Sequence, residues 1–160
     1  LTIRIAKRSK SPPMTTDFES KRNLRLTDDE RVNHLLEEGR RLFNRGEYYD
    51  AHEAWEEMWS EFNLPDRLFI QGIIQVTVSF YHLGTGNLRG SRNLMKRALD
   101  KLTNRGPNDG RWNSPKRGMD STTFIKGIER CGREINAIDE PADFDWSLVP
   151  RLKPAKLAER

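Results

Sequence analysis

A histidine and a glutamate stand one helical turn apart in the first half of the chain. His52 and Glu56 are separated by four positions, so on a helix their side chains leave neighbouring turns of one face. An imidazole and a carboxylate in this arrangement can share a proton, a hydrogen bond or a metal ion such as zinc, iron or manganese. This pair is the first candidate for a functional site.

The helix predicted to carry this pair covers residues 47–62 and is amphipathic. At about 100° per residue, one apolar stripe forms on it, and His52 falls inside that stripe while Glu56 lies at its edge. The stripe consists of Tyr48, Ala51, Trp55, Trp59 and Phe62. Glu53 and Glu57 point further toward solvent.

A second polar stripe interrupts the most apolar segment of the chain, residues 65–83. Apolar side chains surround most of this predicted helix, which favours a central position in the fold. Four polar side chains nevertheless recur along one side of it: Gln71, Gln75, Ser79 and His82. Buried amides and imidazoles are costly unless they are paired. These side chains are therefore expected to find polar partners inside the protein.

We expect the two polar groups to meet, with the second stripe facing His52 and Glu56 and with Gly72 allowing a close approach. The result would be either a hydrogen-bond network that fixes helix register or a ligand site in which the glutamines orient other groups. The candidate ligand-binding residues are His52, Glu56, Gln71, Gln75 and His82, and the candidate ligands of a divalent metal are His52, Glu56 and His82. The chain reads HEAWE from position 52, so the zinc-protease motif HExxH is not present.

Cap and stop residues delimit the helices that must position these groups. Thr27 and Glu30 have the spacing of a capping box at the start of the first helix, and Gly46 ends that helix. Asn87 is placed to cap the fourth helix, and Asp120 precedes the fifth. The predicted helices cover residues 28–46, 47–62, 65–83, 88–102 and 120–140. No segment alternates in the manner of a strand.

Length and composition fit one domain, with 160 residues, a net charge of +4 and 35% hydrophobic residues. The fold class is all-α: a single-domain bundle of about five helices with a hydrophobic central third helix. The expected organisation is a flexible basic arm at 1–26, a helical domain at 27–150 with a loop at 103–119, and a frayed tail at 151–160. An extended segment is expected to dock through Phe144, Trp146 and Leu148.

Two stretches of the chain resemble a known family. They are FNRGEYYDAHEAWEEMW at 43–59 and RLFIQGIIQVTVSFYHLGTGNLRGSRNLMKRAL at 67–99, and the resemblance is to the domain of unknown function 309 (DUF309) family. It implies a compact all-helical bundle and no established reaction. The motif positions are Gly46, Tyr48, Ala51, His52, Glu53, Trp55, Glu56, Trp59, Gln71, Gly72, Gln75, His82, Gly86 and Asn87.

The single cysteine, Cys131, cannot pair within the chain, which favours a reducing, cytoplasmic compartment and excludes a disulfide scaffold. The basic N-terminus has no apolar run of the length of a secretory signal. Polar residues interrupt the most apolar stretch, so no membrane span is expected.

A basic run offers a different interpretation, a nucleic-acid-binding surface. It consists of Arg89, Arg92, Lys96, Arg97 and Lys101 on the predicted fourth helix, continued in the loop by Arg105, Arg111, Trp112, Lys116 and Arg117. Such residues can contact phosphates and stack a base. A solvated helix face explains the run more simply, and residues 27–64, with a net charge of −7, would repel a polyanion.

The preferred function is a non-catalytic helical module that binds a small ligand or a protein partner through its polar centre. A metal-dependent hydrolase that uses the same centre with a divalent metal is the enzyme alternative. A nucleic-acid adaptor is the second alternative. Homodimerisation is a further expectation if part of the aromatic set on residues 47–62 is exposed.

Overall fold

The computed structural model describes residues 26–112 and 117–154, so residues 1–25 of the arm expected at 1–26 and the tail end at 155–160 lie outside the described residues. The described part is all-helical, with five α-helices, two short 3-10 helices and no strands, which confirms the predicted fold class. The elements are α2 (Asp28–Asn44), α3 (Tyr48–Glu61), α4 (Arg67–Gly84), α5 (Leu88–Asn104), α6 (Ser121–Ala137), η1 (Pro141–Asp143) and η2 (Trp146–Leu148). None of these helices has both the length and the apolar character needed to cross a bilayer.

The predicted helix caps at Thr27 and Asn87 are confirmed. Thr27 and Glu30 form a reciprocal capping box, in which Glu30 N–H donates to Thr27 Oγ1 over 3.2 Å. Asn87 caps α5 by accepting from Gly90 N–H, and Asp120 caps α6. The third predicted helix begins two residues later than expected, at Arg67.

Two glycine turns end α2 and α4 in the same way. Gly46 and Gly86 have φ angles of +77° and +87°, values that suit glycine because it lacks a Cβ atom. After each glycine the next backbone N–H returns to the helix, from Glu47 to Leu42 O and from Asn87 to His82 O. The chain therefore reverses twice, and α2 pairs with α3 while α4 pairs with α5.

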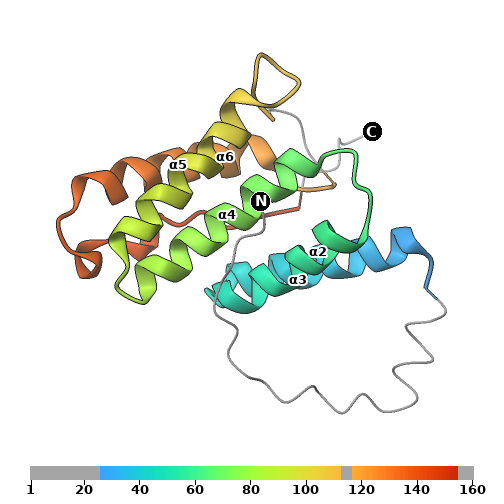
Figure 1. Ribbon diagram of the computed structural model, residues 1–160, viewed down its shortest axis with the longest axis horizontal. Coiled ribbons are helices and arrows are strands. Elements are labelled where there is room, and N and C mark those ends of the chain that lie inside the picture. The colour runs from blue at the N-terminus through green and yellow to red at the C-terminus, as the bar shows by residue number, and fades with distance from the viewer. Residues whose placement is uncertain (1–25, 113–116, 155–160) are drawn as a thin grey trace, which may run out of the picture.

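Helix α4 is central, as predicted (Figure 1). It packs against α3 on one side and α5 on the other, and α6 lies along α5. Of its 18 residues, 12 are buried. The start of α3 and the end of α4 lie at the same end of the bundle (Figure 1).

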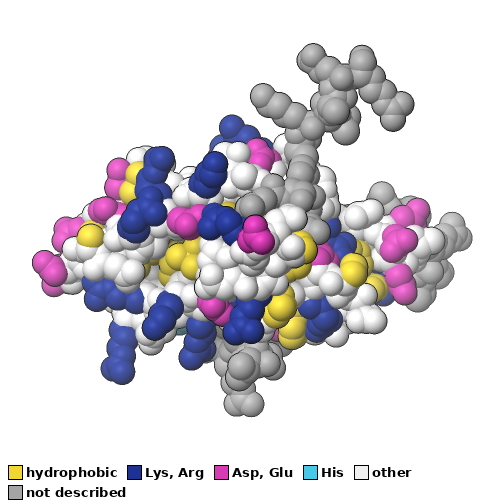
Figure 2. Space-filling view, turned by 90° about the horizontal axis from the view of Figure 1, so that it is seen from above, with side chains coloured by type: hydrophobic (Ala, Val, Ile, Leu, Met, Phe, Trp, Pro, Cys, Tyr) yellow, Lys and Arg dark blue, Asp and Glu magenta, His cyan; other side chains and the backbone are white. Residues whose placement is uncertain are grey.

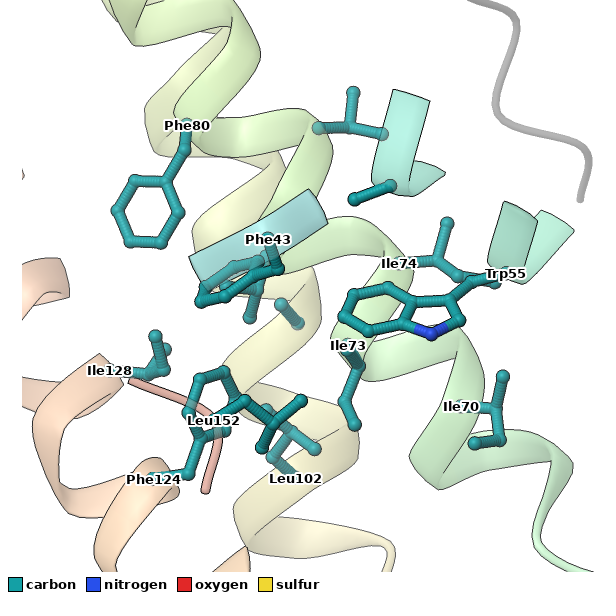
Figure 3. Packing of buried hydrophobic residues seen from close by; sticks show 14 of the residues in the cluster. Phe43, Trp55, Ile70, Ile73, Ile74, Phe80, Leu102, Phe124, Ile128 and Leu152 are labelled. Atoms are coloured by element: carbon teal, nitrogen blue, oxygen red, sulfur yellow. The ribbon is translucent and has the colours of Figure 1, made fainter. Parts of the chain in front are cut away.

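The core is a continuous cluster with Phe43 near its middle (Figure 3). Its ring contacts the rings of Trp55, Phe80 and Phe124 at centroid distances of 6.0, 6.2 and 5.6 Å. These rings come from α3, α4 and α6, so one side chain of α2 joins four helices.

The last described residues form part of the core, which corrects the expectation of a frayed tail from residue 151. Leu152 is fully buried, and the Asn44 amide holds its backbone by accepting from its N–H over 2.8 Å and donating to its C=O over 3.1 Å. Lys153 O accepts from Asp120 N–H. The preceding aromatic segment is also wound into η1 and η2 instead of being extended, with Phe144 buried and Trp146 exposed.

Helices α2 and α3 touch at a glycine. A Cβ atom on Gly39 would lie 2.1 Å from Trp55 Nε1, far inside van der Waals contact. The Trp55 indole is fixed there because its N–H donates to Leu36 O over 3.1 Å. Gly39 therefore makes room for the largest fully buried side chain of the core.

Leu152→Ala tests the role of the C-terminal segment. We expect a loss of about 2–5 kcal/mol in the free energy of unfolding, because the truncation leaves a cavity in the core. Leu68→Ala is the matched control: Leu68 is 43% exposed, and its truncation should cost less than about 0.5 kcal/mol. Equal urea midpoints for the two variants would show that the segment does not contribute to the core.

Gly39→Ala tests the close approach of α2 and α3. Helix propensity alone predicts a gain of up to about 1 kcal/mol, but the clash with Trp55 should reverse the sign and lower the melting temperature. Gly84→Ala is the control, since its Cβ would meet Trp146 at an ordinary 3.8 Å. A Gly39→Ala protein that melts higher than the wild type would contradict the observed packing.

Candidate functional site

His52 is buried on α3 and lacks polar partners. Its side chain is 7% exposed, and neither ring nitrogen has a hydrogen-bond partner among the described residues. Burial lowers the pKa of His52 to about 4, so the ring is neutral near neutral pH. The ring of Tyr49 lies 6.2 Å away, centroid to centroid. A buried imidazole without partners is uncommon in a folded protein and calls for an explanation.

Glu56 follows one turn later on the same helix, as the spacing predicts. Its carboxyl group is half-buried, and burial raises its pKa. It makes no hydrogen bond to the His52 ring, because both ring nitrogens are unpaired. The two groups thus share a face of α3 without interacting directly.

The polar stripe of α4 faces α5, and the expectation that it faces His52 is wrong. Gln75 Oε1 accepts a hydrogen bond from Lys101 Nζ over 2.9 Å. Ser79 donates to Ser91 O over 2.8 Å. The reason is that Ile70 and Ile74 turn the apolar side of α4 toward Trp55 of α3 (Figure 3), which leaves the polar side for α5.

The remaining members of the predicted centre follow the same arrangement. Gly72 does allow a close approach, but to Leu102 of α5, since its Cβ would lie 2.9 Å from Leu102 Cδ2. His82 Nδ1 lies 3.3 Å from the side-chain amide of Asn87, at the turn into α5. Gln71 is half-buried. The α3 and α4 groups are therefore two separate sets.

The predicted metal ligands are not gathered in the structure. In residues 26–112 and 117–154, no three His, Cys, Asp or Glu side chains lie close enough together to hold a metal ion. His52, Glu56 and His82 accordingly form no ligand set.

Two residues of the basic run on α5, Arg92 and Lys101, make hydrogen bonds to other helices of the fold. Arg92 donates to the carbonyl oxygens of Ile135 and Ile138 and so satisfies the end of α6. Lys101 is held by Gln75, and burial lowers its pKa. Three of the five predicted phosphate-contacting residues of α5 remain: Arg89, Lys96 and Arg97. Lys116 of the loop lies outside the described residues. On the face in Figure 2, Lys and Arg side chains are interspersed with Asp and Glu.

A pocket of about 570 Å³ opens where the two glycine turns meet, at the shared end of α3 and α4. We name it the turn pocket. It is lined by Gly46, Glu47, Tyr48, Tyr49, Asp50, Phe80, Tyr81, Gly84, Thr85 and Trp146. Sequence reasoning placed Tyr48 in the apolar stripe of residues 47–62 and missed this pocket. The sequence did contain a signal for the pocket. Gly46 and Gly86 each end a helix close to tyrosines, and a tyrosine at a helix end need not be buried.

Aromatic rings form the walls of the turn pocket. Trp146 stacks on Tyr48 at a centroid distance of 6.0 Å and an interplanar angle of 23°, and it remains 40% exposed. Tyr49 and Tyr81 pair at 5.5 Å. Burial raises the pKa of Tyr48 to about 12, so its phenol stays protonated. The pocket therefore offers fixed ring surfaces with one exposed indole.

The charged groups of the turn pocket are acidic. Glu47 is the N-cap residue of α3 but makes no side-chain cap hydrogen bond, and Asp50 lies in the first turn of that helix. Among residues 26–112 and 117–154, no Lys, Arg or His lines the pocket. Tyr49 connects this acidic, aromatic site to buried His52 through their ring contact.

The buried imidazole predicts a specific loss of stability in acid. The unfolded chain binds a proton at His52 near pH 6.5 and the folded protein only near pH 4, so stability falls as the pH drops between these values, by about 3 kcal/mol in total. His52→Leu should remove this part of the pH dependence, measured as urea-derived free energies of unfolding at about pH 7 and about pH 4.5. His34→Leu, exposed on α2, is the matched control and should keep the wild-type slope. Parallel pH profiles for His52→Leu and the wild type would contradict the burial.

Comparisons with known proteins find an uncharacterised relative and a family model, each of which matches part of the chain. Over 81 residues the chain is 32% identical to an uncharacterised protein of Aquifex aeolicus (strain VF5). That match covers 50% of this chain and 24% of the relative, so the chain spans about a quarter of the relative's length. No solved structure matches the chain.

The family model described as Domain of unknown function (DUF309) matches residues 36–94. This segment runs from the middle of α2 into α5 and contains His52 and every lining residue of the turn pocket except Trp146. Over residues 36–94 the chain is therefore similar to this family, the one that its motifs resemble.

Proposed function

We propose that this domain is a binding module that takes a small organic ligand into the turn pocket. The observation that carries the proposal is a ring-walled pocket of about 570 Å³ with a 40% exposed tryptophan on its rim. Ligand sites in proteins typically have volumes of about 300–1,000 Å³, apolar walls and a few polar groups. The turn pocket has all three properties.

The rigidity of the walls supports binding. Tyr48 packs edge-on against Phe43 and at a tilt of 39° against Phe80, each at a centroid distance of 5.4 Å, so its ring is held by the core. Trp146 packs at right angles to Phe144, which is itself buried. A pocket whose side chains are already ordered loses little conformational entropy when a ligand enters.

His52 contributes to this function through Tyr49. Its ring lies 6.2 Å from that of Tyr49, which lines the pocket, and its nitrogens have no hydrogen-bond partner among the described residues. A ligand or water that reached these nitrogens would satisfy a costly buried group. Gln75 and His82 are committed to Lys101 and Asn87 and do not join His52. A metal-dependent hydrolase needs a set of metal ligands close together, and the described part of the chain gathers no such set. Binding is therefore the better-supported function.

A fragment screen with ¹⁵N-labelled protein tests the proposal. We expect aromatic fragments to shift the indole N–H signal of Trp146 and the amide signals of Tyr49 and Thr85, while the fully buried Trp55 indole stays unchanged. Trp146→Ala should abolish or weaken binding by about tenfold or more, since it removes a major contact surface.

Leu68→Ala is the matched control because Leu68, like Trp146, is a large hydrophobic residue with high exposure. It should bind the same fragments with wild-type affinity. Thermal melting of both variants checks that each is folded. A screen in which no fragment shifts Trp146, or fragment binding that survives Trp146→Ala unchanged, would contradict the proposal.

A further inference from the structure

We infer that the outer face of α5 binds the phosphate backbone of a double-stranded nucleic acid without reading its sequence. This surface, here called the basic face, consists of the exposed side chains Arg89, Asn93, Lys96 and Arg97. Spacings of four, seven and eight residues from the first of them place all four on one side of the helix. The basic face is separate from the lining of the turn pocket, so the inference goes beyond the proposed function and does not depend on it.

Charge is divided between the two helix pairs. Helices α2 and α3 together carry ten Asp or Glu and three Arg, whereas α4 and α5 together carry six Lys or Arg and one Asp. Helix α4 lies between α3 and α5 (Figure 1). The structure thus separates the acidic pair from the basic face by a whole helix.

This separation removes the objection that the sequence raises against a polyanion. Packed helices have axes about 8–10 Å apart, so α3 and α5, on either side of α4, are roughly 16–20 Å apart. Charges in solution are screened over about 8 Å at physiological salt. The acidic residues of the segment 27–64 therefore contribute little repulsion at the basic face.

The one carboxylate of α5 is already engaged. Asp100 accepts hydrogen bonds from the side-chain amide of Asn104 over 3.0 Å and from Arg105 Nε over 3.3 Å. Burial lowers the pKa of Lys101, and the charges of Arg97 and Arg105 lower it further, while the charge of Asp100 acts in the opposite direction. A surface pocket of about 510 Å³ lies here, lined by Asn93, Lys96, Arg97, Asp100 and Lys101. Cations outnumber the engaged carboxylate in it, so the pocket suits a phosphate group.

The length of the basic face fits a polyanion. Arg89 and Arg97 are eight residues apart, which is about 12 Å along the helix at about 1.5 Å per residue. A nucleic-acid duplex carries one phosphate charge per about 1.7 Å of its axis, so its backbone can offer a charge to each cation of the row. A single small phosphate could contact only part of the row.

The aromatic residue of the basic run is not available to stack a base, which corrects the expectation for Trp112. Trp112 is buried, its ring contacts that of Phe69 at a centroid distance of 5.6 Å, and its N–H donates to Lys101 O over 3.0 Å. Helix α5 itself contains no aromatic residue. Proteins that hold single strands rely on ring stacking, whereas phosphate contacts alone carry no sequence information. These residues therefore support contact with the backbone of a duplex.

Fluorescence anisotropy with a labelled duplex of about 20 base pairs and mixed sequence tests the inference on the full chain. We expect a Kd of about 1–100 µM at about 100 mM salt. Each phosphate contact makes the affinity fall with the salt concentration to a power of about 0.9. Contacts from the three cations of the basic face should therefore weaken binding by about 40-fold between about 50 and about 200 mM salt. A duplex of unrelated sequence should bind with the same affinity.

Lys96→Gln combined with Arg97→Gln removes two charges from the basic face and keeps good helix formers there. This double variant should bind the duplex about tenfold or more weakly than the wild type at about 50 mM salt, and the slope of log Kd against log salt should fall by about 2. Arg41→Gln combined with Arg45→Gln is the matched control, because it removes the same charge from exposed positions at the end of α2. It should bind like the wild type within about twofold. Thermal melting checks that both variants are folded.

Four results would overturn the inference. Absence of binding at about 20 mM salt would show that the basic face is only solvated. Equal weakening by the two double variants would show that binding follows net charge and not this face. Tighter binding of the single strand than of the duplex would overturn the duplex assignment. A polyglutamate peptide of equal charge that binds as tightly as the duplex would assign the basic face to an acidic protein partner.

Discussion

The contact of Phe43 with four other rings is the interaction on which the rest of the structure depends. Phe43 is 2% exposed and touches Tyr48, Trp55, Phe80 and Phe124 at centroid distances of 5.4 to 6.2 Å. Close packing of large rings fixes the relative positions of the elements that carry them. The same contact that holds the helices together therefore also holds Tyr48, a wall of the turn pocket, in place.

Local signals in the sequence predicted the helices well because they act over a few residues. The Thr27–Glu30 capping box, the Asn87 cap and the glycine stops each depend on neighbours within one helical turn, and all appear where expected. The largest shift of a predicted start, to Arg67, follows a proline whose fixed φ suits several positions near a helix start.

The candidate site was predicted only in part because it depends on which helices are neighbours. Periodicity showed that α4 has a polar side but not that α5 would cover it, and the hydrogen bond from Lys101 to Gln75 spans 26 residues of sequence. His52 was correctly predicted to be buried, yet no periodic pattern could show that its nitrogens lack partners. The turn pocket needs Trp146, which lies far along the chain from Tyr81.

The two hydrogen bonds between the Asn44 side chain and the Leu152 backbone bear on the order in which the domain can be completed during synthesis. They join positions 108 residues apart, so α2 through α5 leave the ribosome before the side chain that seals their core. Until then the growing chain contains residues 36–94, which the family model matches, but it lacks Leu152 in the core and Trp146 in the wall of the turn pocket. Contacts of such long sequence separation form late. The turn pocket and the last part of the core are thus both incomplete until Trp146 and Leu152 are in place.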